Sequence, residues 1–73
     1  ESGSYECEQM GIKITYILKA NGRAKEITPF GTKRGYWQDD DDAAIIINKK
    51  TVIEDMGNGK YVLNRYFSCI KIK

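Results

Sequence analysis

Residues 12–19, with the sequence IKITYILK, carry apolar side chains at every second position and are rich in β-branched residues. A period of two is typical of a strand that buries one face. Four residues would form this face: Ile12, Ile14, Tyr16 and Leu18. The strand leads to Asn21 and Gly22, a pair that favours a tight hairpin because both residues tolerate positive φ. The sequence therefore predicts a β-hairpin whose second strand is residues 23–28 and ends before Pro29.

The rest of the chain continues this pattern of short strands and turns. Residues 30–35, FGTKRG, are bounded by glycine and predict a loop. Residues 56–60, MGNGK, predict a second tight turn, and residues 60–73 predict one long final strand whose last residues alternate. We therefore expect an all-β fold, a small antiparallel meander or barrel in which no long strand edge is left bare.

Residues 41–56 are compatible with two structures. A helix there would begin at an aspartate cap and end at Gly57, and it would make the fold α+β. A hairpin would instead pair residues 43–47 with residues 51–54 through the turn at residues 48–50. The runs of isoleucine, threonine and valine favour strands, so we expect the hairpin and keep the helix as the alternative.

The length of 73 residues allows one domain, residues 1–73. A chain this short buries only about 60% of the surface that its unfolded form exposes, so its stability depends on additional constraints. We expect residues 1–4, ESGS, to be a tether or a tag remnant rather than part of the fold.

The two cysteines, Cys7 and Cys69, lie near opposite ends of the chain. They lack the spacing of zinc ligands, and the chain contains no histidine. They are either reduced thiols of a cytosolic protein or one disulfide of an exported protein. A bridge that closes a loop of roughly sixty residues would stabilise the fold by about 4 kcal/mol. Because so small a core needs this contribution, we expect the disulfide Cys7–Cys69.

Several kinds of chemistry have no candidate residues in the sequence. The absence of histidine excludes histidine-dependent catalytic triads, and no glycine-rich phosphate loop is present. The four consecutive aspartates at residues 39–42 lack the alternating ligands and the distal glutamate of a calcium loop. We therefore expect no catalytic residue, no metal site, no cofactor and no small-molecule substrate, and we predict that the protein is not an enzyme.

The segment GYWQDDDD, residues 35–42, is the strongest candidate for a binding site. We expect a polar loop in which the aromatic side chains anchor a protein partner and the carboxylates attract a cationic one. The candidate partner-binding residues are Lys33, Tyr36, Trp37, Asp39, Asp40, Asp41 and Asp42.

A different function is also compatible with the composition. Five tyrosines, one tryptophan and scattered lysines on a small barrel would suit a cytosolic module that binds single-stranded nucleic acid, with reduced cysteines. The net charge of only +2 and the aspartate run oppose this function. It would gain if the lysines and the aromatic residues shared one face away from the aspartates.

Three segments resemble a known family. Residues 4–18, SYECEQMGIKITYIL, and residues 60–72, KYVLNRYFSCIKI, resemble the first and last strands of the bacterial periplasmic and membrane-bound inhibitors of C-type lysozyme. Residues 35–47, GYWQDDDDAAIII, are similar to that family's aromatic and acidic segment. Together they cover about half of the chain. The family's inhibitory Ser-Gly-x-x-Tyr motif lacks its serine here, where residues 29–36 read PFGTKRGY.

The chain also resembles small lipocalin-like lipoprotein domains, in its Asn-Gly turn, its Gly-x-Trp segment and its IIIN strand. Both resemblances imply an exported bacterial β-barrel that works by binding, located in the periplasm, anchored to the outer membrane or secreted. A lysozyme inhibitor would have a cationic enzyme as its partner. A lipid anchor upstream of Glu1 is a further expectation from these resemblances.

Overall fold

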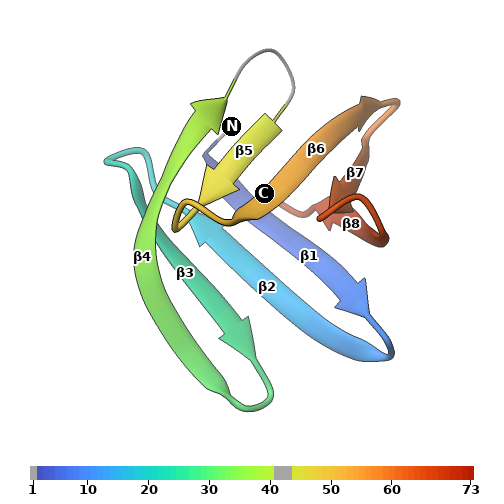
Figure 1. The fold of residues 1–73 in the computed structure, drawn as a ribbon, viewed down its shortest axis with the longest axis horizontal. Helices are drawn as coiled ribbons and strands as arrows, with labels where there is room; N and C mark the ends of the chain where they lie inside the picture. Colours follow the sequence, from blue (N-terminus) through green and yellow to red (C-terminus); the bar gives the residue numbers. More distant parts are fainter. Residues whose placement is uncertain (1, 41–43) are drawn as a thin grey trace.

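The computed structural model describes residues 2–40 and 44–73, which form a barrel of antiparallel strands (Figure 1). The strands of the described residues are β1 (Gly3–Gln9), β2 (Ile12–Leu18), β3 (Arg23–Thr28), β4 (Gly31–Asp40), β5 (Ala44–Ile47), β6 (Thr51–Gly57), β7 (Lys60–Leu63) and β8 (Phe67–Lys71). Each strand pairs with the next one along the chain, and β8 pairs with β1 to close the barrel. The all-β prediction is confirmed.

The described part of the chain contains no helix that is long and apolar enough to cross a membrane.

The first predicted hairpin is formed by β2 and β3. Its turn is held by two backbone hydrogen bonds, from the Gly22 N–H to the Lys19 carbonyl (3.0 Å) and from the Lys19 N–H to the Arg23 carbonyl (2.8 Å). Gly22 has a φ of +88°, a conformation that the absence of a Cβ makes inexpensive. The predicted hairpin is confirmed, but of the Asn-Gly pair only Gly22 has a positive φ. Asn21 contributes instead through its side-chain oxygen, which accepts a hydrogen bond from the Arg23 N–H at 3.0 Å.

The hairpin at residues 44–57 is also confirmed, and the helical alternative is wrong for these residues. β5 and β6 pair through the turn at residues 48–50, in which Asn48 and Lys49 have positive φ. Ile45 and Ile53 face each other in the ladder and are both buried. A period of two buries these branched side chains on the barrel side of both strands. Residues 41–43 lie outside the described residues.

The loop predicted at residues 30–35 is wrong, because residues 31–40 form the strand β4. The chain turns at Pro29 and Phe30, and β4 then pairs with β3 from Gly31 opposite Thr28 to Tyr36 opposite Arg23. The glycines that suggested a loop lie within the ladder, Gly31 opposite Thr28 and Gly35 opposite Ala24. The side chains between them are exposed, which is why this strand carries no apolar alternation.

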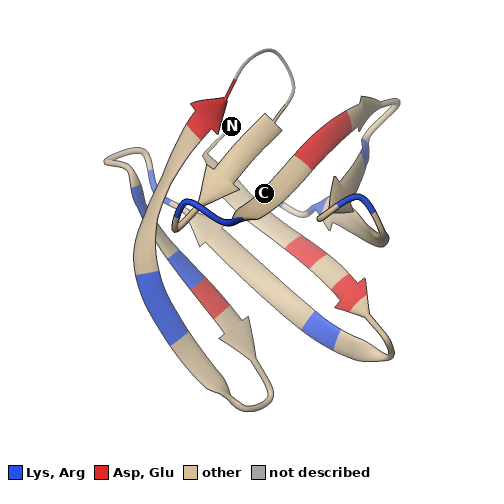
Figure 2. Ribbon diagram, viewed as in Figure 1, with Lys and Arg blue, Asp and Glu red and all other residues tan. Residues whose placement is uncertain are grey.

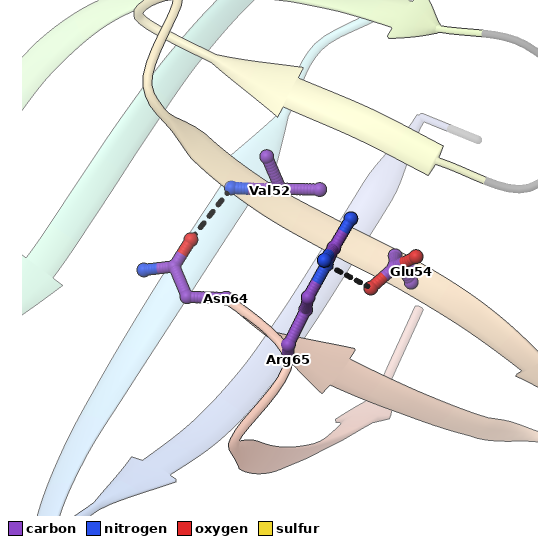
Figure 3. Close-up of polar contacts among 4 residues, drawn as sticks. All are labelled: Val52, Glu54, Asn64 and Arg65. Atoms are coloured by element: carbon purple, nitrogen blue, oxygen red, sulfur yellow. Dashed lines mark hydrogen bonds and ion pairs between the residues drawn. The ribbon is translucent and has the colours of Figure 1, made fainter.

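The single final strand predicted at residues 60–73 is divided into β7 and β8 by a turn at residues 64–66. Asn64 and Arg65 have φ values of 50° and 70°, which interrupt the extended chain. The side-chain oxygen of Asn64 accepts a hydrogen bond from the Val52 N–H at 2.9 Å (Figure 3). Asparagine tolerates the left-handed conformation better than most residues, so this turn is a consequence of Asn64.

The barrel interior is filled by apolar residues from every strand except β4. The buried residues are Tyr5, Cys7, Ile14, Tyr16, Leu18, Ala24, Ile45, Ile47, Ile53, Leu63 and Cys69. From β4, Trp37 packs against this core and is partly buried. The predicted strand face at residues 12–18 is confirmed for three of its four members, whereas Ile12 lies near the strand start and is 36% exposed.

The disulfide Cys7–Cys69 is present, as predicted. The two cysteines are direct partners in the ladder between β1 and β8, which has register pairs only from Tyr5 to Cys7. The bridge therefore holds the seam at which the barrel closes. Two residues of the predicted tether at residues 1–4 belong to the fold. Gly3 and Ser4 are part of β1 and pair with Leu18 and Ile17.

Candidate functional site

Strand β4 carries most of the predicted partner-binding residues, and its alternation divides them between two faces. Gly35 lies opposite the buried Ala24, and Trp37 lies opposite the buried Ile47, so these positions face the barrel. Tyr36, between them, points outward and is 63% exposed. The outer face of β4 is therefore the face that a partner can reach.

The main chain at Tyr36 is held firmly although its ring is exposed. The Tyr36 N–H donates to the side-chain oxygen of Asn48 (3.0 Å), and the Asn48 N–H donates to the Tyr36 carbonyl (2.8 Å). The guanidinium of Arg23 lies over the Tyr36 ring at 5.6 Å from its centre. An exposed aromatic ring is thus fixed on a rigid strand, which lowers the entropy lost on binding.

Trp37 is partly buried, unlike Tyr36, and it is held by two hydrogen bonds. Its indole N–H donates to the Lys19 carbonyl at 2.7 Å, and its backbone N–H donates to the Gly22 carbonyl at 3.0 Å. The ring also packs against the core. Trp37 therefore ties β4 to the β2–β3 turn and is not part of an exposed aromatic pair with Tyr36.

Two shallow grooves flank Tyr36. The first, called the basic groove below, has a volume of about 280 Å³. Its lining residues are Lys19, Arg23, Ala24, Lys25, Arg34, Gly35 and Tyr36. The second, called the apolar groove, also has a volume of about 280 Å³. Its lining residues are Tyr36, Trp37, Gln38, Ile46, Asn48 and Lys49.

The predicted acidic residues lie at the far end of β4. Asp39 and Asp40 are exposed and belong to the strand rather than to a loop, where they pair with Ile45 and Ala44. Asp40 shares the outer face with Tyr36, whereas Asp39 alternates to the other face. Asp41 and Asp42 lie outside the described residues. Figure 2 shows the acidic end of β4 well separated from the basic segment of the same strand.

Lys33 is separated from the other predicted residues. It lies opposite Glu26 on the barrel side of β4, but it is exposed. β5 pairs with β4 only from residue 37 to residue 40, so the first half of β4 has β3 as its only described neighbour. Of the predicted residues that the structure describes, only Tyr36 and Asp40 share the outer face.

The cations of the basic groove were not predicted as a site. The sequence did contain a usable signal, because the Asn21–Gly22 turn fixes the register of β3 and the buried Ala24 places Arg23 and Lys25 on the outer face. The contribution of Arg34 was missed because residues 30–35 were predicted to be a loop.

One polar contact lies at the edge of the barrel interior. The buried hydroxyl of Tyr16 donates a hydrogen bond to Oε2 of Glu26 at 2.8 Å. Burial, reinforced by this hydrogen bond and by the nearby negative charge, raises the pKa of Tyr16 well above its ordinary value. Tyr16 therefore stays protonated at neutral pH and serves as a hydrogen-bond donor.

The residues described by the structure include no group of three or more histidine, cysteine, aspartate or glutamate side chains that could hold a metal ion.

The fold and this surface define a class of protein, a small disulfide-closed up-and-down β-barrel with a charged outer face. The chain matches no protein-family model, no curated protein and no solved structure. The function must therefore be argued from the surface itself.

Proposed function

We propose that the protein is a noncatalytic binding module that docks on a protein partner through the outer face of β4, centred on Tyr36. The observation that carries this proposal is the combination of a ring that is 63% exposed with a backbone whose N–H and carbonyl are both hydrogen-bonded to Asn48. Rigid exposed tyrosines are among the residues that dominate the energy of protein interfaces. The apolar groove beside the ring offers a place for an apolar side chain of the partner.

Charge supports a partner whose contacting surface is basic near the end of β4. Asp39 and Asp40 lie there, beyond the aromatic centre, and both are exposed. Carboxylates at the rim of an interface accelerate the encounter with a cationic partner more than they strengthen the final complex. Together with the resemblance of the terminal strands, this makes C-type lysozyme the first partner to test, with inhibition as the expected consequence.

The disulfide supports an oxidising compartment, and we extend this to an exported location. A disulfide-bonded barrel agrees with a periplasmic, an outer-membrane-anchored or a secreted location. Anchoring to the outer membrane would use a lipid attached upstream of Glu1. Cell fractionation combined with thiol labelling in intact cells tests this part of the proposal. Labelled, reduced cysteines in a cytosolic fraction would contradict it.

The test of the binding function is a titration of C-type lysozyme with the purified protein, followed by calorimetry and by the rate of cell-wall lysis. We expect Tyr36→Ser to weaken binding by about thirtyfold, because an aromatic anchor contributes about 2 kcal/mol. Tyr66→Ser is the matched control, since Tyr66 is 85% exposed on the β7–β8 turn and lies outside the proposed surface.

Two results would count against this function. If the unsubstituted protein does not bind lysozyme, the proposed partner is wrong. If Tyr36→Ser and Tyr66→Ser weaken binding equally, the proposed surface is wrong.

A further inference from the structure

The basic groove contains a charge arrangement that folding alone does not favour. Lys25 and Arg34 are direct partners in the ladder between β3 and β4, and both point to the outer face. Like charges that lie directly opposite each other across a sheet destabilise it. Arg23, two residues before Lys25, adds a third cation on the same face, and Lys19 adds a fourth from the β2–β3 turn.

No carboxylate among the described residues neutralises this group. The ion pairs in the described part of the chain are Lys13–Glu6 and Arg65–Glu54, and neither involves the groove. Glu26 follows Lys25 in the sequence, but its side chain is on the barrel side, where it accepts the hydrogen bond of Tyr16. The positive field of the groove is therefore directed to solvent.

The aspartates of β4 that the structure describes lie more than a screening length from Arg23 and Arg34. Asp40 lies six residues beyond Arg34 and four residues beyond Tyr36, the partner of Arg23, which corresponds to about 20 Å and about 13 Å along the strand. At physiological ionic strength, charges are screened over about 8 Å. The basic groove and the acidic end of β4 thus act as separate electrostatic sites. In Figure 2 the basic segment of β4 and the acidic end of the same strand lie well apart.

The spacing of the cations suits a ligand with repeated negative charges. Arg23 and Lys25 are two residues apart on the same face of β3, so they are separated by about 7 Å. Tyr36 lies opposite Arg23, and its exposed ring connects the basic groove to the apolar groove. A row of cations beside an aromatic ring and an apolar recess is the combination that binds single-stranded nucleic acid.

We propose that the basic groove binds the phosphate backbone of a single-stranded nucleic acid, with one base against Tyr36 and the apolar groove. Phosphates contact Lys19, Arg23, Lys25 and Arg34. The base must be unpaired to reach the ring, so a duplex does not satisfy both grooves. This site shares Tyr36 and the apolar groove with the proposed protein-docking surface, but its charged part is the basic groove rather than the acidic end of β4.

The test is a fluorescence-anisotropy titration of a labelled oligothymidylate of about ten nucleotides with the disulfide-bonded protein. The affinity should fall with salt, with a slope of up to about −2.8 if four phosphates are neutralised at −0.7 each. Lys25→Ser/Arg34→Ser should weaken binding by about tenfold or more and reduce the magnitude of the slope by about 1.4.

Lys50→Ser/Lys60→Ser is the matched control, because it removes the same charge from two exposed residues that do not line the groove. It should retain most of the affinity and the slope. A circular-dichroism melt of each variant establishes that the barrel is intact. Equal losses in the two double variants would overturn the proposal, and so would failure of the unsubstituted protein to bind.

A second comparison distinguishes a nucleic acid from any other polyanion. Tyr36→Ser should weaken binding of the oligothymidylate by about fivefold or more, because stacking contributes at least about 1 kcal/mol per base. The same substitution should not weaken binding of an abasic phosphodiester chain of equal length. If the unsubstituted protein binds both chains equally well, the proposal is wrong and the groove is a site for polyanions such as sulfated polysaccharides.

The lysozyme titration separates this site from the proposed function. Lys25→Ser/Arg34→Ser removes positive charge, so it should not weaken binding to a cationic partner. Loss of oligonucleotide binding with retained lysozyme binding would show that the basic groove serves the nucleic acid alone, although both ligands contact Tyr36.

Discussion

At the scale of single residues, the buried hydroxyl of Tyr16 shows how one polar group is accommodated in an apolar barrel. Its hydrogen bond to Glu26 satisfies a donor that burial would otherwise leave without water, and burial raises its pKa. In the unfolded chain the same hydroxyl ionises near pH 10. Its contribution to stability is therefore fully present below that pH and is lost as the pH rises toward the higher pKa of the folded state.

The raised pKa of Tyr16 in the folded state predicts how Tyr16→Phe changes the pH dependence of stability. The stability of the unsubstituted protein should fall with increasing pH above about pH 10, and the variant should show a shallower fall because it has no proton to lose at this site. Urea titrations between about pH 9 and pH 11 measure this difference. Tyr66→Phe, at an exposed tyrosine, is the control and should follow the unsubstituted protein.

At the scale of elements, two asparagines make the same kind of hydrogen bond at the ends of β5 and β7. Asn48 follows β5 and Asn64 follows the last residue of β7, both with φ near 50°. Each side-chain oxygen accepts a backbone N–H of the preceding paired strand, that of Tyr36 for Asn48 and that of Val52 for Asn64. These bonds extend the ladder past the point at which the backbone leaves it. Figure 3 shows the bond made by Asn64.

Asn48 has a second consequence, because it positions the backbone of Tyr36. We expect Asn48→Ala to destabilise the barrel by about 2 kcal/mol, from one lost hydrogen bond and from an alanine in the left-handed region. Asn48→Gly should cost about 1 kcal/mol, since glycine adopts that conformation easily. Thermal or urea unfolding measures both values.

Asn64→Ala provides the matched comparison at this scale. It should destabilise the barrel by a similar amount, but only the Asn48 variants should weaken binding at Tyr36. Equal binding losses would show that both asparagines act through global stability alone. Gly35→Ala should resemble Asn48→Ala, because a Cβ at Gly35 would collide with the Asn48 side chain.

At the scale of the whole molecule, the barrel depends on closure between its first and last strands. The ladder between β1 and β8 has three register pairs, whereas β1 and β2 have seven. The disulfide lies within the shorter ladder and joins residues that are 62 apart in sequence. A covalent link across this seam restricts the unfolded chain far more than any local contact does.

Cys7→Ser/Cys69→Ser should therefore reduce the free energy of unfolding by about 4 kcal/mol. For a domain of 73 residues this is a large share of the total, so the variant should be partly or wholly unfolded at 37 °C. Circular-dichroism melts with and without reductant measure the effect. Reductant should have no effect on the variant, and an unchanged melting temperature would contradict the structural role of the bridge.

Much of the fold is encoded locally. The alternation in residues 12–18, the Asn21–Gly22 turn and the branched residues 44–54 determine strands and turns through near neighbours, because backbone sterics and side-chain period act over a few residues. The same local signals failed at residues 31–35 and 60–73. In the first segment the exposed strand β4 has no apolar alternation and was taken for a loop. In the second, the positive-φ turn at Asn64 and Arg65 lies between two strand-like segments that were read as one.

The sequence by itself thus determined the fold class, the β2–β3 and β5–β6 hairpins and the pairing of Cys7 with Cys69. Only the tertiary structure decided which side chains share a surface. Trp37 faces the core because the register of β4 and β5 sets it opposite Ile47, and Arg34 lies opposite Lys25 because of the register of β3 and β4. Register between strands depends on long-range pairing, and a shift of one residue would move every side chain to the other face.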